Sequence, residues 1–163
     1  MIEPKASTGV IIWLSALLIV GPSSVLAQNN LNEADFKIKD FGIIHGNPWV
    51  IVEGKAGGSI PQNASLIYAY TFVTDNGTFS VMSHAYEDTD EVENDTQWHT
   101  HRVTLDDKNC VTEINDNGDT EVNDLVKVTN IITTNVSKVF TAELALNNID
   151  SSICVTKIFD SAP

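Results

Sequence analysis

Residues 66–86 read LIYAYTFVTDNGTFSVMSHAY, and this stretch decides the fold class. Every second residue from Leu66 to Phe72 is apolar, so these side chains fall on one side of an extended strand. Asn76-Gly77 can supply the positive φ angles of a tight turn, and a second strand-like run follows from Phe79 to Tyr86. The stretch therefore predicts a β-hairpin.

The rest of the chain continues this pattern, because short β-rich runs alternate with clusters of Gly, Asn, Asp and Pro, and helical periodicity is nearly absent. A second hairpin turn is predicted at Asn117-Gly118. Besides the first hairpin, the expected strands are Phe36–Ile44, Trp49–Glu53, Gln97–Leu105, Cys110–Ile114, Leu125–Ile132, Val136–Leu146 and Ile153–Phe159. Short links predict an all-β fold, either an antiparallel β-sandwich or an open barrel of about eight strands.

Residues 1–27 have the layout of a secretory signal peptide. Lys5 precedes an apolar run from Val10 to Val20, and the stretch ends in Val25-Leu26-Ala27. The apolar run is shorter than the roughly 20 residues of a membrane-spanning helix. We therefore expect cleavage after Ala27, which leaves residues 28–163 as one secreted or cell-surface β-domain. A retained anchor is the alternative.

Cys110 and Cys154 are the only cysteines, and an oxidising compartment favours a disulfide bond between them. The bond would attach the last strand to the run that begins at Cys110. Two buried free thiols are the alternative, and a zinc site is disfavoured because no C-x-x-C pair is present.

The formal net charge of −13 describes a strongly acidic exterior. Such a surface repels phosphate backbones and anionic lipids, which argues against nucleic-acid binding and against peripheral adsorption to membranes. No stretch after residue 27 is long and apolar enough to span a bilayer, so we expect no membrane insertion after signal cleavage. The acidic surface favours divalent cations or basic partners, or serves only to keep the domain soluble. Four N-x-S/T sequons could be glycosylated in an exporting cell, at Asn63, Asn76, Asn94 and Asn135.

Two histidines define the candidate metal site. His99 and His101 are one residue apart on an expected strand, so they point to the same face. If this strand pairs with the run that ends at Tyr86, His84 lies opposite His99, and Met82 lies opposite His101. Imidazole and thioether ligands suit copper better than calcium or magnesium. A one-residue slip in pairing would separate them, and a row of histidines bonded only to their neighbours is the alternative.

Two acidic segments resemble calcium ligands. Residues 87–95 supply many carboxylates, yet a solvated acidic loop accounts for the same composition. Residues 113–124 imitate a calcium loop, with Glu113, Asn115, Asn117, Gly118, Glu121 and Asp124 at the liganding and turn positions. The flanking runs are strand-like, however, so we expect a hairpin that turns at Asn117-Gly118.

Templates for hydrolases find little support, since the chain has no G-x-S-x-G, no H-E-x-x-H and no phosphate-binding glycine loop. A pair of carboxylates for sugar hydrolysis leaves no local signature, so a hydrolase of surface polymers stays a third hypothesis. An enzyme is nevertheless the less favoured class.

The segments WHTHRVTLDD at residues 98–107 and ICVTKIFD at residues 153–160 give the chain a resemblance to small secreted proteins of ammonia-oxidising archaea. The resemblance implies an envelope-facing or extracellular protein of copper-dependent organisms, without an assigned activity or site. Sequence alone thus favours a non-catalytic extracellular or cell-surface β-domain that binds a partner or an envelope component. The alternative is a copper-binding or copper-handling protein that uses His84, His99, His101 and Met82. The sequence leaves the oligomeric state open.

Overall fold

A computed structural model describes residues 31–84, 98–147 and 149–163. Within these residues the fold is all-β, and ten strands stand where about eight were expected. The elements are η1 (Glu33–Phe36), β1 (Ile38–Ile44), β2 (Asn47–Val52), β3 (Leu66–Thr74), β4 (Gly77–His84), β5 (His99–Leu105), β6 (Val111–Asp116), β7 (Asp119–Val122), β8 (Val126–Thr129), β9 (Val136–Leu146) and β10 (Ile153–Ala162). The expected signal segment and the acidic run at 87–95 lie outside the described residues.

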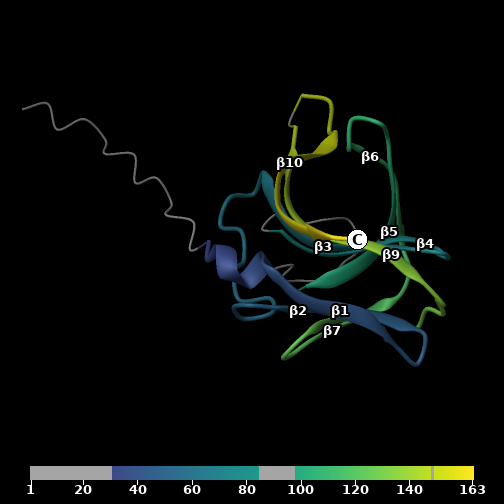
Figure 1. The fold of residues 1–163 in the computed structure, drawn as a ribbon. Coiled ribbons are helices and arrows are strands. Elements are labelled where there is room, and N and C mark those ends of the chain that lie inside the picture. The colour runs from purple at the N-terminus through teal and green to yellow at the C-terminus, as the bar shows by residue number, and fades with distance from the viewer. Residues whose placement is uncertain (1–30, 85–97, 148) are drawn as a thin grey trace, which may run out of the picture.

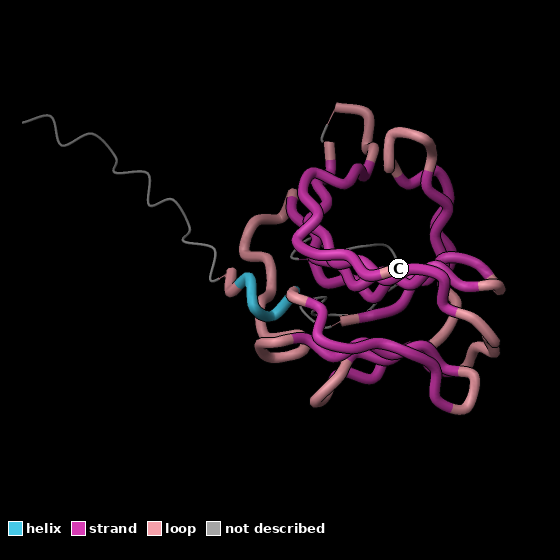
Figure 2. Tube along the Cα trace, viewed as in Figure 1, coloured by secondary structure: helices cyan, strands magenta, loops and turns pink. Residues whose placement is uncertain are grey.

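Two antiparallel sheets form the sandwich that the sequence predicts (Figure 1). One sheet has the order β1-β2-β8-β7, and the other has the order β10-β9-β3-β4-β5-β6. Figure 2 shows the smaller sheet lying beneath the larger one, whose outer hairpins curve away from it. No helix among the described residues is long and apolar enough to span a bilayer.

The predicted hairpin is confirmed, and its first strand lies in the middle of the larger sheet. Thr74 pairs with Gly77 across the turn, and Gly77 has a φ of 124°. This positive φ favours glycine, whereas the only close neighbour of a Cβ atom here would be the flexible end of the Arg102 side chain. β3 pairs with β4 on one side and with β9 on the other. Tyr68, Tyr70 and Phe72 belong to one apolar cluster, and Ile67 and Ala69 belong to another on the opposite face, so β3 is buried on both faces.

The first core fills the space between the two sheets. Phe36 is its centre, with ring centroids 5.2 Å from Tyr68, 5.5 Å from Tyr70 and 4.6 Å from Phe159. The hydroxyl of Tyr70 donates to the Asp35 carbonyl at 2.8 Å and accepts from the Gly57 N–H at 3.1 Å. These bonds attach η1 and the loop after β2 to the core, so Phe36 belongs to η1 and not to the strand expected there.

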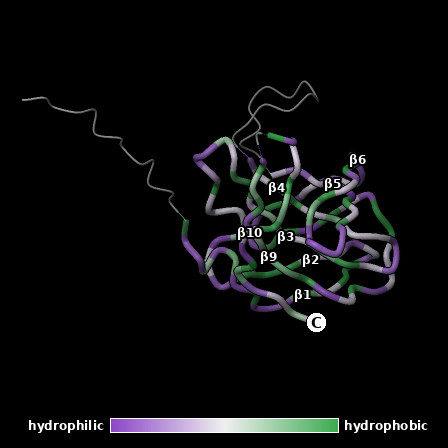
Figure 3. Tube along the Cα trace, turned by 90° about the horizontal axis from the view of Figure 1, so that it is seen from above, coloured by the Kyte–Doolittle hydropathy of each residue, from purple (hydrophilic) through white to green (hydrophobic). Residues whose placement is uncertain are grey.

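The second core lies on the face of the larger sheet that points away from the smaller sheet. We call this face the inner face. The second core is formed by Ile67, Ala69, Met82, Val103, Phe140, Ala142 and Leu144. In Figures 1 and 2 the β9–β10 and β5–β6 hairpins rise on this side of the sheet and approach each other. Figure 3 shows hydrophobic residues along the strands and hydrophilic residues at many turns. The inner face is thus enclosed by its own sheet.

The predicted disulfide bond joins the two hairpins. Cys110 lies just before β6, and Cys154 lies near the start of β10. The two cysteines also form an isolated antiparallel bridge, and the Val155 N–H donates to the Asn109 carbonyl at 3.0 Å. The edge strands of the larger sheet therefore meet at this point, although no continuous ladder joins them.

The hairpin predicted at Asn117-Gly118 is wrong. β6 pairs with β5 in the larger sheet, whereas β7 pairs with β8 in the smaller one. The two residues carry the chain from one sheet to the other, and Gly118 provides a φ of 87° together with close packing against Val128. The calcium-like positions of residues 113–124 are consequently divided between two sheets. β7 escaped prediction because its residues, DTEV, are mostly polar and half exposed at a sheet edge.

We predict that replacing both cysteines, Cys110→Ser with Cys154→Ser, lowers the free energy of unfolding by about 2–4 kcal/mol. The bond closes a segment with a sequence separation of 44, and its loss restores entropy to the unfolded chain. Urea unfolding at pH 7 measures the change. Wild-type protein treated with a reductant is the control and should match the double variant, whereas unchanged stability would contradict the structural role of the bond.

Candidate functional site: a row of histidines on the inner face

The larger sheet gathers three histidines at one end of its inner face. His84 ends β4, while His99 begins β5 and His101 follows two residues later. Side chains alternate along each strand, so all three share the face that carries Met82 and Val103. The prediction that these histidines lie on one face of adjacent strands therefore agrees with the structure.

The expected pairing partners are wrong by two residues. Met82 pairs with His99, and Ser80 pairs with His101. His84 lies beyond the last paired residue, and it reaches His99 as a diagonal neighbour. A shift of two residues preserves the face, which is why the cluster survives. Met82 is buried in the second core, and the structure does not place it opposite His101.

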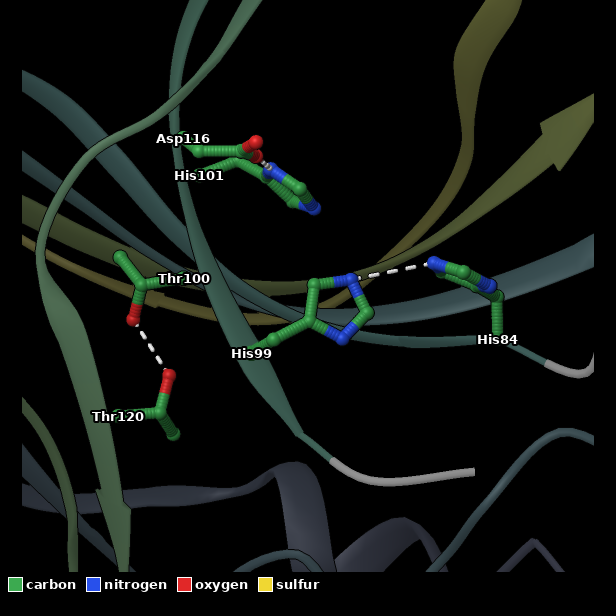
Figure 4. A network of polar contacts seen from close by, with 6 residues as sticks. All are labelled: His84, His99, Thr100, His101, Asp116 and Thr120. Carbon is green, nitrogen blue, oxygen red and sulfur yellow. Dashed lines mark hydrogen bonds and ion pairs between the residues drawn. The ribbon is translucent and has the colours of Figure 1, made fainter. Parts of the chain in front are cut away.

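The rings of the three histidines lie edge to face along the row (Figure 4). Nε2 of His84 is 3.1 Å from Nε2 of His99, and these ring centroids are 4.8 Å apart. The centroids of His99 and His101 are separated by 4.7 Å. Two imidazole nitrogens at this separation either share a proton, one donating and one accepting, or can share an ion.

Asp116 completes the row and was not anticipated. It ends β6 opposite His101, and its Oδ1 lies 3.0 Å from His101 Nδ1. The Asp116 side chain is 78% exposed, whereas that of His101 is 7% exposed. Burial lowers the pKa of His101 and neighbouring His99 lowers it further, while Asp116 opposes both effects. The neutral ring then donates its Nδ1–H to Asp116, which leaves Nε2 with its lone pair on the side of the other two histidines (Figure 4).

The other side of β5 fixes its position against the smaller sheet. Thr100 Oγ1 contacts Thr120 Oγ1 of β7 at 2.5 Å (Figure 4), and Trp98 Nε1 donates to the Gly57 carbonyl at 3.1 Å. These contacts alternate with the histidines along one strand. The sequence could not indicate Asp116 or Thr120, since both depend on pairings between segments far apart in the chain.

A pocket of about 400 Å³ borders the row. Its lining includes His99 and His101 together with the carboxylates of Asp116 and Asp119. Two carboxylates beside two imidazoles favour a cation over an anion. As the side chains stand, no three His, Cys, Asp or Glu residues in the described parts of the chain are grouped so that they could hold a metal ion. The close pair of His84 and His99 is thus the nucleus of the candidate site, and His101 is its neighbour.

Three of the predicted sequons lie on the surface of the described domain. Asn63, Asn76 and Asn135 are exposed, whereas Asn94 lies outside the described residues. The Asn76 amide donates to the Ile132 carbonyl at 3.1 Å. Glycosylation at these positions stays a prediction.

We predict that the free energy of unfolding falls as the pH drops below about 6.5. The pKa of His101 is lower in the folded chain than in the unfolded chain, where it is about 6.5. As the pH falls below about 6.5, the unfolded chain therefore binds a proton before the folded chain does, and this favours unfolding. The contribution of His101 to the free energy of unfolding is complete above about pH 6.5 and is lost as the pH falls to its pKa in the folded chain. Urea unfolding at pH 7.5 and pH 5.0 tests this. The slope should be shallower in His101→Gln and unchanged in His45→Asn, at a turn away from the row. Equal slopes in wild type and His101→Gln would contradict the assignment.

Comparisons with known proteins identify no relative of the chain. The chain matches no protein-family model and no curated protein, and the structure matches no solved structure. The resemblance to secreted archaeal proteins therefore stays a prediction, and function has to be argued from the side chains themselves.

Proposed function

We propose that the chain is a non-catalytic domain that acts outside the cytoplasm and binds copper through His84, His99 and His101. The observation that carries this proposal is the 3.1 Å separation between Nε2 of His84 and Nε2 of His99. With metal–nitrogen bonds of about 2.0–2.1 Å, two ligands at 90–110° around one ion lie about 2.8–3.4 Å apart. The two rings already have the spacing of neighbouring ligands.

His101 is the third ligand of the proposed site. Its hydrogen bond to Asp116 resembles the carboxylate–histidine contacts that orient metal-binding imidazoles and raise their basicity. The centroid of its ring lies 4.7 Å from that of His99, next to the close pair. Burial disfavours protonation of this ring, and a neutral imidazole is the form that binds metal.

The surroundings support a soft or borderline cation. Neutral imidazoles suit copper or zinc, whereas calcium and magnesium require oxygen ligands. The net charge of −13 and the carboxylates of Asp116 and Asp119 attract cations toward the pocket. Met82, the pairing neighbour of His99, adds a thioether nearby on the same face and tips the preference toward copper.

We predict that calorimetric titration of the purified domain with Cu(II) finds one saturable site per chain. His84→Ala combined with His99→Ala should weaken binding by about 100-fold or more, because two ligands are lost. His45→Asn is the control, since it removes an exposed imidazole outside the row. Circular dichroism verifies that each variant folds. Equal affinity in the double variant and wild type would refute the site.

We also predict that Asp116→Asn weakens copper binding by about tenfold, while the stoichiometry stays at one. The amide keeps the size of the side chain but removes the charge that orients His101. Asp119→Asn is the matched control, because Asp119 lines the same pocket without a hydrogen bond to a histidine in the described structure. An effect of equal size in both variants would indicate general attraction and not orientation.

Binding of a partner or an envelope component stays a second candidate. It is favoured by two exposed isoleucines, Ile44 at 49% and Ile132 at 80% exposure. They lie at one end of the molecule, where the Thr133 N–H donates to the Gly46 carbonyl at 2.9 Å. Light scattering tests the form of this candidate in which copies of the chain assemble, and a monomer at all concentrations would count against that form.

A further inference from the structure

The inner face carries a second site at the end opposite the histidines. β5 begins at His99 and runs toward Val103 and Leu105, where it pairs with the start of β4. There a cavity of about 460 Å³ opens between β5 on one side and β9 and β10 on the other. Its volume lies in the range of about 300–1,000 Å³ that small-molecule sites occupy.

Apolar side chains form half of the lining of this cavity. These six side chains come from four strands, namely Val73, Val103, Leu105, Phe140, Val155 and Ile158. Asn109 adds the loop beside the disulfide bond, where its carbonyl accepts from the Val155 N–H. The cavity therefore lies beneath the point at which the two hairpins are joined.

Its charged lining is entirely cationic. Arg102 and Lys138 line the cavity, and no Asp or Glu of the described chain does. The whole sequence has 22 acidic residues and 9 basic ones, so the chain is negatively charged overall. The charged residues that line this cavity are positive instead. An acidic protein that concentrates cations around an apolar cavity has the complement of an anion with an apolar body.

Both cations retain charge for a ligand. Nη2 of Arg102 donates to the Asn76 carbonyl at 3.0 Å, and Lys138 Nζ lies 5.6 Å from the centre of the Phe140 ring. Neither is paired with a carboxylate within the described residues; the ion pairs there use Lys37, His101, Lys127 and Lys157. A carbonyl and an aromatic ring hold the two groups in place without neutralising them.

We propose that this cavity binds a small amphipathic anion, a carboxylate attached to an alkyl chain of medium length. The alkyl chain packs against Val103, Leu105 and Phe140, and Lys138, on the same face of β9 as Phe140, donates to the carboxylate. Arg102 lies beside the β3–β4 turn, where it donates to the Asn76 carbonyl, and adds positive charge nearby. This site is separate from the proposed copper site, since it uses the opposite end of β5 and ligands of opposite charge.

Calorimetric titration of the oxidised protein with decanoate tests the proposal. We expect one saturable site, with decanol bound about tenfold more weakly because it lacks the charge. Lys138→Met should weaken decanoate binding by about tenfold, and Arg102→Met should weaken it less, because that side chain is held at the Asn76 carbonyl. Lys39→Met is the matched control and should stay within about twofold, since it removes an exposed cation of β1 outside the cavity.

Three further experiments test where and how decanoate binds. His84→Ala with His99→Ala should keep full decanoate affinity, which separates this site from the copper site. Val155→Phe should weaken binding of decanoate and decanol alike by filling the cavity, with folding verified by circular dichroism. Vesicles with 30% phosphatidylglycerol should leave the protein in the supernatant, which distinguishes a free amphiphile from a membrane surface. Absence of saturable decanoate binding, equal affinity for decanol, or sedimentation with vesicles would overturn the proposal.

Discussion

The structure depends on the curvature of the larger sheet, which brings its two edges together at a single bridge. Six strands bend until the residues beside β6 and β10 touch, and the Cys110–Cys154 bond holds the two edges at that point. A flat sheet of this size would leave its inner face open to water. The curvature instead buries a second core on this face, separate from the first core between the two sheets. A chain of moderate length thus contains two separate apolar layers.

The inner face of this curved sheet has two ends that differ in the charge of their side chains. At the His99 end, neutral imidazoles lie beside the carboxylates of Asp116 and Asp119. At the Leu105 end, Arg102 and Lys138 line an apolar cavity. The apolar residues of the second core separate the two ends, so a cation at one and an anion at the other do not compete for the same groups. Alternation along β5 permits this, because its other side is occupied by contacts of Trp98 and Thr100 with the rest of the sandwich.

Local patterns in the sequence were sufficient for the features that depend on neighbouring residues. Alternation and Asn76-Gly77 predicted the β3–β4 hairpin, because a short turn determines its own pairing. The cysteine count predicted the bond. The partners of His99 were wrong, since the segment between β4 and β5 is too long to define which residues face each other. Asn117-Gly118 shows the same limit, because a positive φ serves a crossing between sheets as well as a hairpin. Asp116 was unforeseeable, as its place beside His101 follows from the pairing of β6 with β5.

The pairing of β4 with β5 holds the histidines on the inner face, and the disulfide bond joins the two edges of the sheet around that face. Cross-strand nuclear Overhauser effects in the oxidised protein measure both parts directly in one sample. We expect backbone contacts between Met82 and His99, and also between Cys110 and Cys154. Contacts that place the His84 backbone opposite His99, or the lack of any contact across the cysteine bridge, would contradict this arrangement.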